Sequence, residues 1–228
     1  MTQTEPRARS AEARREPLSR ARIVEAALRV MDAEGLEAVT MRRLGRELGV
    51  EAMSLYNHVA DKDDVLAGIV ERVMTEYDTP PSRGDWRDDA RNAAREWRRI
   101  MTLHPNVMTL MVERRKPLTT PDAMRPMDAA IGIMRAAGLD VRDAAQTFQA
   151  FGAFIMGFVM MEQGMMFGRG EGGDGFTPAE QAEFARMVAA GELTYLTEAL
   201  PVLHECALDD QFELGLDLLI RGVESKLR

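Results

Sequence analysis

The sequence predicts an all-α fold made of a small N-terminal helical domain and a larger helical domain that follows it. Apolar residues recur at the spacing of a helix along most of the chain, and no alternating strand pattern of useful length occurs. The consecutive prolines Pro80 and Pro81 interrupt this periodicity, because proline cannot continue a helix interior. We therefore expect a flexible arm at 1–17, a first domain at 18–79 and a second domain at 80–228.

Four expected helix starts in the first domain have the same sequence pattern. The residue just before the N-cap is apolar, and a second apolar residue follows it five positions later. Such a pair packs as a hydrophobic staple and fixes the angle at which the chain enters the helix. The caps are Ser19, Thr40, Glu51 and Asp61. Glutamate is not a preferred N-cap residue, so the third start is the weakest. The expected helices run from Ser19 to Gly35, from Thr40 to Gly49, from about 52 to 58, and onward from Asp61.

The second domain is also expected to be entirely helical. The apolar spacing predicts helices at about 85–101, 105–113, 121–137, 140–163, 177–203 with a bend, and 209–227. The glycine-rich segment 164–176 should form a flexible loop between two of these helices.

The composition limits the possible partners and compartments. A net charge of -8 argues against sequence-blind binding to nucleic acid or anionic lipid, although it leaves room for a local basic patch. The single cysteine, Cys206, excludes an intrachain disulfide and suits a reducing compartment, and a buried inert thiol is favoured over a reactive one. The N-terminal residues lack the apolar stretch of a secretory signal, and the apolar run 148–161 is too short to span a bilayer. We expect a soluble, cytoplasmic protein without a membrane partner.

Two short helices joined by a turn at Gly49 form a helix-turn-helix pattern at about 40–59, in which the second helix enters the major groove of DNA. Arg42, Arg43 and Arg46 form a cationic edge on the first of these helices, where a duplex would lie. An ordinary solvated face is the alternative interpretation of these arginines. The pattern therefore predicts a DNA-binding domain.

Two segments make this prediction more specific: GLEAVTMRRLGRELGV at 35–50 and SLYNHVADKDDVL at 54–66. With them, residues 19–66 resemble the DNA-binding domain of the TetR family of bacterial repressors. The resemblance implies that some residues approach bases while others hold phosphates, which fixes the register without reading sequence. The base-contacting set is Arg42, Ala52, Met53, Ser54 and Asn57, and the phosphate-contacting set is Thr40, Tyr56, His58 and Lys62.

For two of these residues, a purely structural role is the alternative to DNA contact. Tyr56 could pack at the rim of the domain, and His58 could cap its own helix. Beside Lys62, the backbone N–H groups at the start of the fourth helix also suit a phosphate.

Parts of the second domain resemble the tetracycline-repressor branch of the same family, namely GDWRDDARNAAREWRR, AAGLDVRDAAQTFQAFGAFIMGFVMMEQ and the glycine-rich loop. The resemblance implies a ligand-binding and dimerisation domain. Tetracycline-sensing members need histidines and a glutamate around a magnesium chelate, whereas Asp78, Leu110–Met111 and Met161–Glu162 occupy those places here. We therefore expect no metal ion and no cofactor, and we do not expect tetracycline to be the inducer.

The run 148–161 is apolar on nearly every side, as expected for a helix that is buried on opposite faces. One face is expected to line a cavity for a bulky hydrophobic ligand, to which flexible methionines would adapt, and plain core packing is the alternative. The expected ligand-binding residues are Met101, Met108, Met111, Phe151, Ile155, Phe158 and Met161. The last helix is expected to pair with 143–163 across a two-fold axis in a four-helix interface, with a plain core helix as the alternative.

Together these features predict a homodimeric regulator of transcription that binds double-stranded DNA at a palindromic operator. We expect a repressor that is released by a small hydrophobic ligand; the alternative is a ligand-independent DNA-binding repressor or architectural protein. The sequence has no nucleophile elbow, phosphate loop, metal-spaced His/Cys set or carboxylate pair in an apolar setting, so we do not expect an enzyme.

Overall fold

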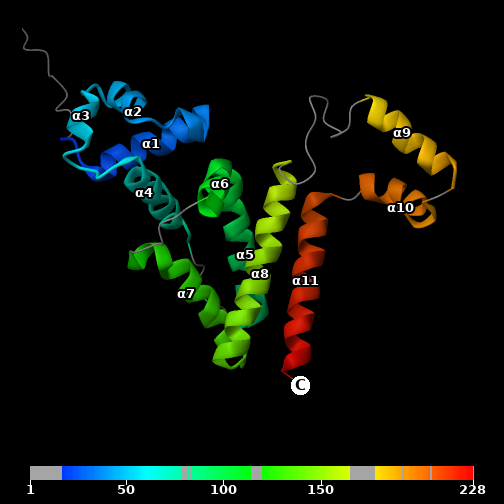
Figure 1. Ribbon diagram of the computed structural model, residues 1–228. Helices are drawn as coiled ribbons and strands as arrows, with labels where there is room; N and C mark the ends of the chain where they lie inside the picture. The colour runs from blue at the N-terminus through cyan, green and yellow to red at the C-terminus, as the bar shows by residue number, and fades with distance from the viewer. Residues whose placement is uncertain are drawn as a thin grey trace, which may run out of the picture.

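The computed structural model describes residues 17–78, 82, 84–113, 120–164, 178–191, 193–205 and 207–227, and every regular element in these ranges is a helix (Figure 1). Residues 1–16, which make up most of the expected arm, lie outside the described residues. Residues 165–177, which include most of the expected glycine-rich loop, and Cys206 lie outside them as well. The helices α1–α3 lie together at one end of the molecule. Helix α4 leads from them to the remaining helices.

The N-terminal elements are α1 (Arg20–Glu34), the 3-10 helix η1 (Leu36–Ala38), α2 (Met41–Leu48), α3 (Ala52–Leu55) and α4 (Lys62–Met74). Three of the four expected caps accept a hydrogen bond from the backbone N–H three residues further on: Ser19 from Arg22, Thr40 from Arg43 and Asp61 from Asp64. Glu51 makes no such bond, in line with its poor capping chemistry.

Helix α3 is shorter than expected. It ends at Leu55, and 56–58 form a turn in which Tyr56, Asn57 and His58 donate their N–H groups to carbonyls three residues earlier. Such tighter bonds are common where a helix ends. The side chains of 56–58 are all exposed, so no buried face supports another helical turn there.

The C-terminal elements are α5 (Trp86–Leu103), α6 (Pro105–Glu113), α7 (Pro121–Ala136), α8 (Val141–Glu162), α9 (Pro178–Ala189), α10 (Thr194–Glu205) and α11 (Leu208–Lys226). The bend expected within 177–203 is a full break between α9 and α10. Gly191 lies there with a φ of 73°, a backbone conformation that favours glycine. Helices α8 and α11 lie side by side, whereas α9 and α10 project away from the rest (Figure 1).

Helix α8 is the centre of the C-terminal part, where it contacts α5, α7 and α11. Its 22 residues are long and apolar enough to cross a membrane by length and composition alone, so the apolar stretch is longer than the sequence suggested. The core helix of a soluble protein passes the same test, but the three helices that contact α8 cover only part of it: 33% of its most apolar 18-residue window is buried.

Helix α11 packs against α8 by apolar contacts and is joined to α5 by ion pairs. Its buried face consists of Phe212, Leu216, Ile220 and Val223. Three arginines one helical turn apart on α5 reach carboxylates on α11, in the pairs Arg87–Glu224 at 2.5 Å, Arg91–Asp217 at 2.7 Å and Arg95–Glu213 at 2.7 Å. Each pair is partly exposed and contributes little stability alone, but the series sets the register between the two helices.

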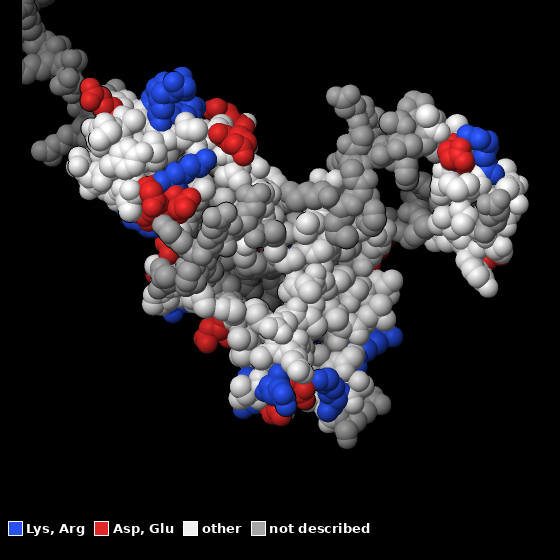
Figure 2. Space-filling view, viewed as in Figure 1, with Lys and Arg blue, Asp and Glu red and all other residues white. Residues whose placement is uncertain are grey.

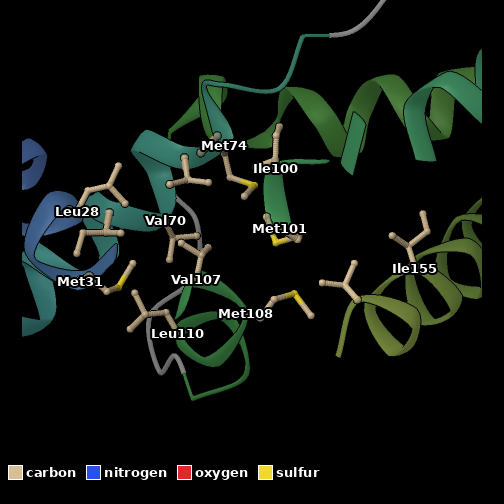
Figure 3. Close-up of a cluster of buried hydrophobic side chains, with 14 of the residues drawn as sticks. Leu28, Met31, Val70, Met74, Ile100, Met101, Val107, Met108, Leu110 and Ile155 are labelled. Atoms are coloured by element: carbon tan, nitrogen blue, oxygen red, sulfur yellow. The ribbon is translucent and has the colours of Figure 1, made fainter. Parts of the chain in front are cut away.

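The described part of the chain shares a hydrophobic cluster that runs from α1 to α11. Figure 3 shows its middle section, which passes from Leu28 on α1 through Val70 on α4 and Met101 on α5 to Ile155 on α8. The N-terminal helices are therefore packed onto the C-terminal ones rather than tethered to them by a loose linker.

Gly45 allows the close approach of α2 and α3. A Cβ at this position would lie 2.9 Å from the Val50 carbonyl oxygen and 3.1 Å from the Ala52 nitrogen, and neither backbone atom can move aside freely. In contrast, a Cβ at Gly132, in the exposed part of α7, would meet no atom within 4 Å.

We expect Gly45→Ala to destabilise the protein by about 1–3 kcal/mol, because the overlap with backbone outweighs the better helix propensity of alanine. Gly132→Ala is the matched control and should stabilise the protein by up to about 1 kcal/mol. Urea denaturation followed by circular dichroism measures both free energies of unfolding. A stability gain for both variants would contradict the close packing of α2 on α3.

Candidate DNA-binding and ligand-binding sites

The turn between α2 and α3 is held by backbone bonds. Gly49 adopts a left-handed conformation with a φ of 69°, and the N–H of Val50 donates to the carbonyl of Gly45 at 2.9 Å. Beneath the turn, Leu44 and Leu55 are completely buried. These contacts fix the angle between the two helices and hold the outer side of α3 away from the core.

The structure brings the expected DNA-contacting residues to one exposed surface. Met53 is 72% exposed and Tyr56 45% exposed, so both side chains are accessible to a partner. The other exposed members are Thr40, Arg42, Asn57 and His58, and the half-buried ones are Ala52, Ser54 and Lys62. Thr40 also has a structural role as the N-cap of α2.

The cationic edge of α2 contains fewer unpaired arginines than the sequence suggested. Arg43 does not face outward as a free charge, because it pairs with Glu34 at 2.6 Å and with Glu47 at 2.7 Å. The hydrogen bond from Arg43 also lowers the pKa of Glu34. Arg42 and Arg46 are exposed and form no ion pair with any residue that the structure describes. Figure 2 shows the resulting basic patch on the N-terminal helices, with acidic residues on either side.

The start of α4 offers a phosphate less than expected. The Asp61 carboxylate accepts from the N–H of Asp64 at 2.7 Å, and the Asp64 carboxylate accepts from the N–H of Ala60 at 3.0 Å. These two carboxylates occupy donors and add negative charge at the helix N-terminus. The N–H of Asp64 is therefore already engaged, while the ammonium group of Lys62, between the two carboxylates, is still suited to a phosphate.

The C-terminal helices line a partly open cavity of about 260 Å³. Its described lining comes from α5, α6, α7, α8 and the end of α4, and it contains no charged side chain. The polar tip of Tyr77 is engaged, because its hydroxyl donates to the carbonyl of Ala93 at 3.3 Å. Burial, with a smaller contribution from Glu96, raises the pKa of Tyr77 to about 12, so this phenol stays neutral. The wall is therefore apolar and uncharged.

Three of the expected ligand-binding residues, Met111, Phe151 and Ile155, line the cavity. The other four, Met101, Met108, Phe158 and Met161, are not in its described lining. Met101 and Met108 are buried in the core (Figure 3). Phe158 faces α11, where its ring meets that of Phe212 at 5.0 Å.

Other lining residues were not anticipated from the sequence. They are aromatic residues and methionines on α4, α5 and α7 and in the segment just after α4, including Met74, Tyr77, Trp97, Met124, Met127 and Met134. Their helical spacing indicated buried faces, but spacing alone does not tell which buried faces surround a hollow. Within the described residues, no group of three or more His, Cys, Asp or Glu side chains is arranged to hold a metal ion.

Comparison with known proteins identifies the family. Residues 23–69 match the family described as bacterial regulatory proteins, tetR family, and residues 79–227 match the tetracyclin repressor-like C-terminal domain. The chain belongs to the TetR family. It is therefore a DNA-binding regulator of transcription, as the helix-turn-helix pattern predicted.

Individual TetR-family proteins match over most of the chain. The chain is 31% identical to the HTH-type transcriptional repressor DrrR1 of Streptomyces coeruleorubidus, over 89% of this chain and 76% of that protein. It is 28% identical to the class C tetracycline repressor protein of Escherichia coli, over 91% of each. Among solved structures, ActR of Streptomyces coelicolor in complex with (S)-DNPA superposes with a TM-score of 0.76 at 29% identity, over 92% of this chain and 99% of that one.

The TetR-family fold leaves one apolar face of this chain uncovered. Leu214 and Leu218, one turn apart on α11, are 61% and 62% exposed. Beside them α8 presents the exposed small residues Ala150 and Ala153, and only 33% of its most apolar 18-residue window is buried. An uncovered face of this kind is typical of a surface that meets another protein.

Proposed function

We propose that this protein is a homodimeric repressor that binds a palindromic operator and leaves it when an uncharged hydrophobic ligand fills the cavity. The observation that carries the proposal is the course of α4. Lys62 at its start belongs to the proposed DNA surface. Met74 at its end lines the cavity, and so does Tyr77, three residues further along the chain. A 13-residue helix spans about 20 Å, so one rigid element connects the two sites.

The relatives support this proposal. DrrR1 is named a transcriptional repressor, and ActR is known in complex with a small molecule. The cavity argues against the alternative of a ligand-independent repressor, because a constitutive DNA-binding protein has no need of an unfilled apolar interior. The protein is inferred to act by binding and not by catalysis, and to work in the cytoplasm, where the operator DNA lies.

At the operator, Arg42 and the outward residues of α3 are proposed to read bases while Thr40, Tyr56, His58 and Lys62 hold phosphates. Arg42 is the strongest candidate for base readout, since an arginine free of ion pairs can donate two hydrogen bonds to a guanine. Lys62 reaches only the backbone of the duplex in this arrangement, so it contributes affinity without specificity.

We expect Arg42→Ala to weaken operator binding by about 1–3 kcal/mol, and Lys62→Ala to reduce the salt dependence of binding by about one unit of slope. Fluorescence anisotropy at several salt concentrations measures both, with a duplex that the unmodified protein has selected from a random-sequence pool. Arg125→Ala, which removes an exposed arginine from α7, is the charge-matched control and should change neither quantity. Unchanged affinity and slope for both test variants would contradict the proposed contacts.

The uncovered face of α8 and α11 is proposed to be the dimer interface. Two helices from each of two copies make a four-helix bundle, and a two-fold axis presents two α3 helices to the two halves of a palindrome. The exposed leucines on α11 and the small residues on α8 suit close packing of this kind.

We expect Leu218→Arg to convert the dimer into a monomer and to abolish specific operator binding, because a buried guanidinium without a partner costs several kcal/mol. Sedimentation equilibrium measures the mass. Leu103→Arg is the control: Leu103 is 55% exposed at the end of α5, away from this face, and its replacement should leave the dimer intact. A Leu218→Arg protein that remains dimeric would show that the interface lies elsewhere.

The wall of the cavity determines the class of ligand. Its described residues offer aromatic and methionine side chains but no charge, so an ionised ligand would lose its hydration without gaining a partner. Tyr77 and Trp97, whose ring centroids lie 6.3 Å apart, present aromatic surface to a flat molecule.

We expect the uncharged dye N-phenyl-naphthylamine to bind at least about ten-fold more tightly than its sulfonated analogue, anilinonaphthalene sulfonate, which differs mainly by one negative charge. Fluorescence titration gives both dissociation constants. Gly152 lines the cavity with open space around its Cβ position, so Gly152→Leu should weaken binding of the uncharged dye, whereas Gly132→Leu on the exposed side of α7 should not. Equal affinity for the two dyes would overturn the assignment of an uncharged ligand.

A further inference from the structure

A histidine lies where the two halves of the molecule meet. His104 follows the last residue of α5 and precedes Pro105, the first of α6. Its Nδ1 lies 2.9 Å from Oδ2 of Asp32 near the end of α1, and its Nε2 lies 3.1 Å from Oε2 of Glu76 just after α4. The side chain of His104 is only 13% exposed. One imidazole ring thus bridges three segments that are distant in sequence.

The contacts around this bridge are directional. A carboxylate only accepts hydrogen bonds, so each contact requires an N–H on the ring nitrogen that faces it. Beside the bridge, the side-chain amide of Asn106 donates to the carbonyl of Met31 on α1 at 3.0 Å. The junction between α5 and α6 therefore holds the end of α1 by two polar contacts.

Glu76 connects the bridge to α4 and back to α1. Its other carboxylate oxygen accepts from Arg72 at 2.8 Å, and Arg72 donates through Nε to Glu25 at 3.0 Å. A chain of charged and polar groups therefore runs from Glu25 on α1 through Arg72 and Glu76 to His104 and returns to α1 at Asp32.

The same turn of chain also reaches the cavity. Glu76 stands between Met74 and Tyr77, both of which line the cavity wall. A ligand that displaces this turn must either shift Glu76 relative to His104 or carry the bridge with it. Apolar contacts tolerate small sliding movements, whereas hydrogen bonds with fixed direction weaken steeply when they are misaligned.

We propose that His104 is the positioning residue through which occupation of the cavity acts on the DNA-binding helices. The inference rests on the function proposed above and specifies how the ligand site is regulated. His104 contacts neither DNA nor the cavity: it holds the ends of α1 and α4 in one arrangement, so a displacement at Met74 and Tyr77 is passed to α1 as a rotation of the N-terminal helices.

The test uses Gly152→Leu as a built-in occupant of the cavity, so no natural ligand is needed. Operator affinity is measured by anisotropy with the selected duplex, for Gly152→Leu alone and in combination with His104→Gln. We expect Gly152→Leu to weaken operator binding about 5- to 150-fold in the otherwise unmodified protein. In the His104→Gln background the same substitution should change affinity less than about three-fold. Asp32→Asn, which keeps the histidine and removes one carboxylate, should reduce the effect in the same direction.

Val107→Ala separates the bridge from general loosening of the junction. Val107 is completely buried on α6, one turn from His104, and its truncation weakens packing there without touching a polar contact. The effect of Gly152→Leu should persist in this background. The same fold-change in the His104→Gln background as in the unmodified protein, or its loss with Val107→Ala as well, would overturn the role of His104. If Gly152→Leu leaves operator affinity unchanged in the unmodified protein, the ligand response itself is wrong, and this inference fails with it.

Discussion

The packing of α4 into a core that spans the whole molecule is the constraint on which the other features depend. Val65, Ile69, Val70 and Val73 of this helix are completely buried, with α1 on one side and the C-terminal helices on the other. Because protein interiors are close-packed, a displacement at one end of such a helix cannot be absorbed locally. The N-terminal helices are therefore joined to the C-terminal core by close packing, which gives the proposed ligand response a path from the cavity to the DNA-binding helices.

The charge distribution serves the same arrangement. An acidic protein that binds DNA must concentrate its positive charge where the duplex lies, and here carboxylates pair with three arginines of the N-terminal helices. Arg20, Arg43 and Arg72 form ion pairs that connect the N-terminal helices to one another. Arg42 and Arg46 are exposed and form no ion pair with a residue that the structure describes, so the proposed recognition would rest on a few groups of defined geometry rather than on a diffuse field.

Much of the fold follows from local signals in the sequence. Cap residues, helical spacing and the proline break predicted the order of the helices and most of their bounds, because those features depend on a residue and its near neighbours. The partners of Arg43 show how far such local signals predict contacts. Glu47, four residues away on the same helix, was within reach of a local rule. Glu34 lies on another helix, and only the packing of α1 on α2 brings it there.

The cavity shows more clearly what local sequence patterns cannot predict. The apolar character of α8 was evident in the sequence, and three residues expected to bind ligand do line the hollow. Met101 and Met108 have the same composition signal but are buried in the core between helices (Figure 3), because the side of a helix that meets a void is decided by how several helices cross. The walls contributed by α4 and α7 depend on long-range packing for the same reason.

A cavity built from methionine, alanine and aromatic side chains can change shape at little cost, since few of its contacts are directional. That adaptability suits a site for hydrophobic molecules. It also means that small adjustments of the wall side chains alone would absorb a displacement caused by a ligand. A response that reaches the DNA therefore requires some rigid element at the edge of the soft wall. The turn that carries Met74, Glu76 and Tyr77 provides one, because its apolar residues sense the cavity while its carboxylate is held by Arg72 and His104. Soft packing on one side of this turn and fixed hydrogen bonds on the other allow a nonspecific apolar contact to produce a defined movement.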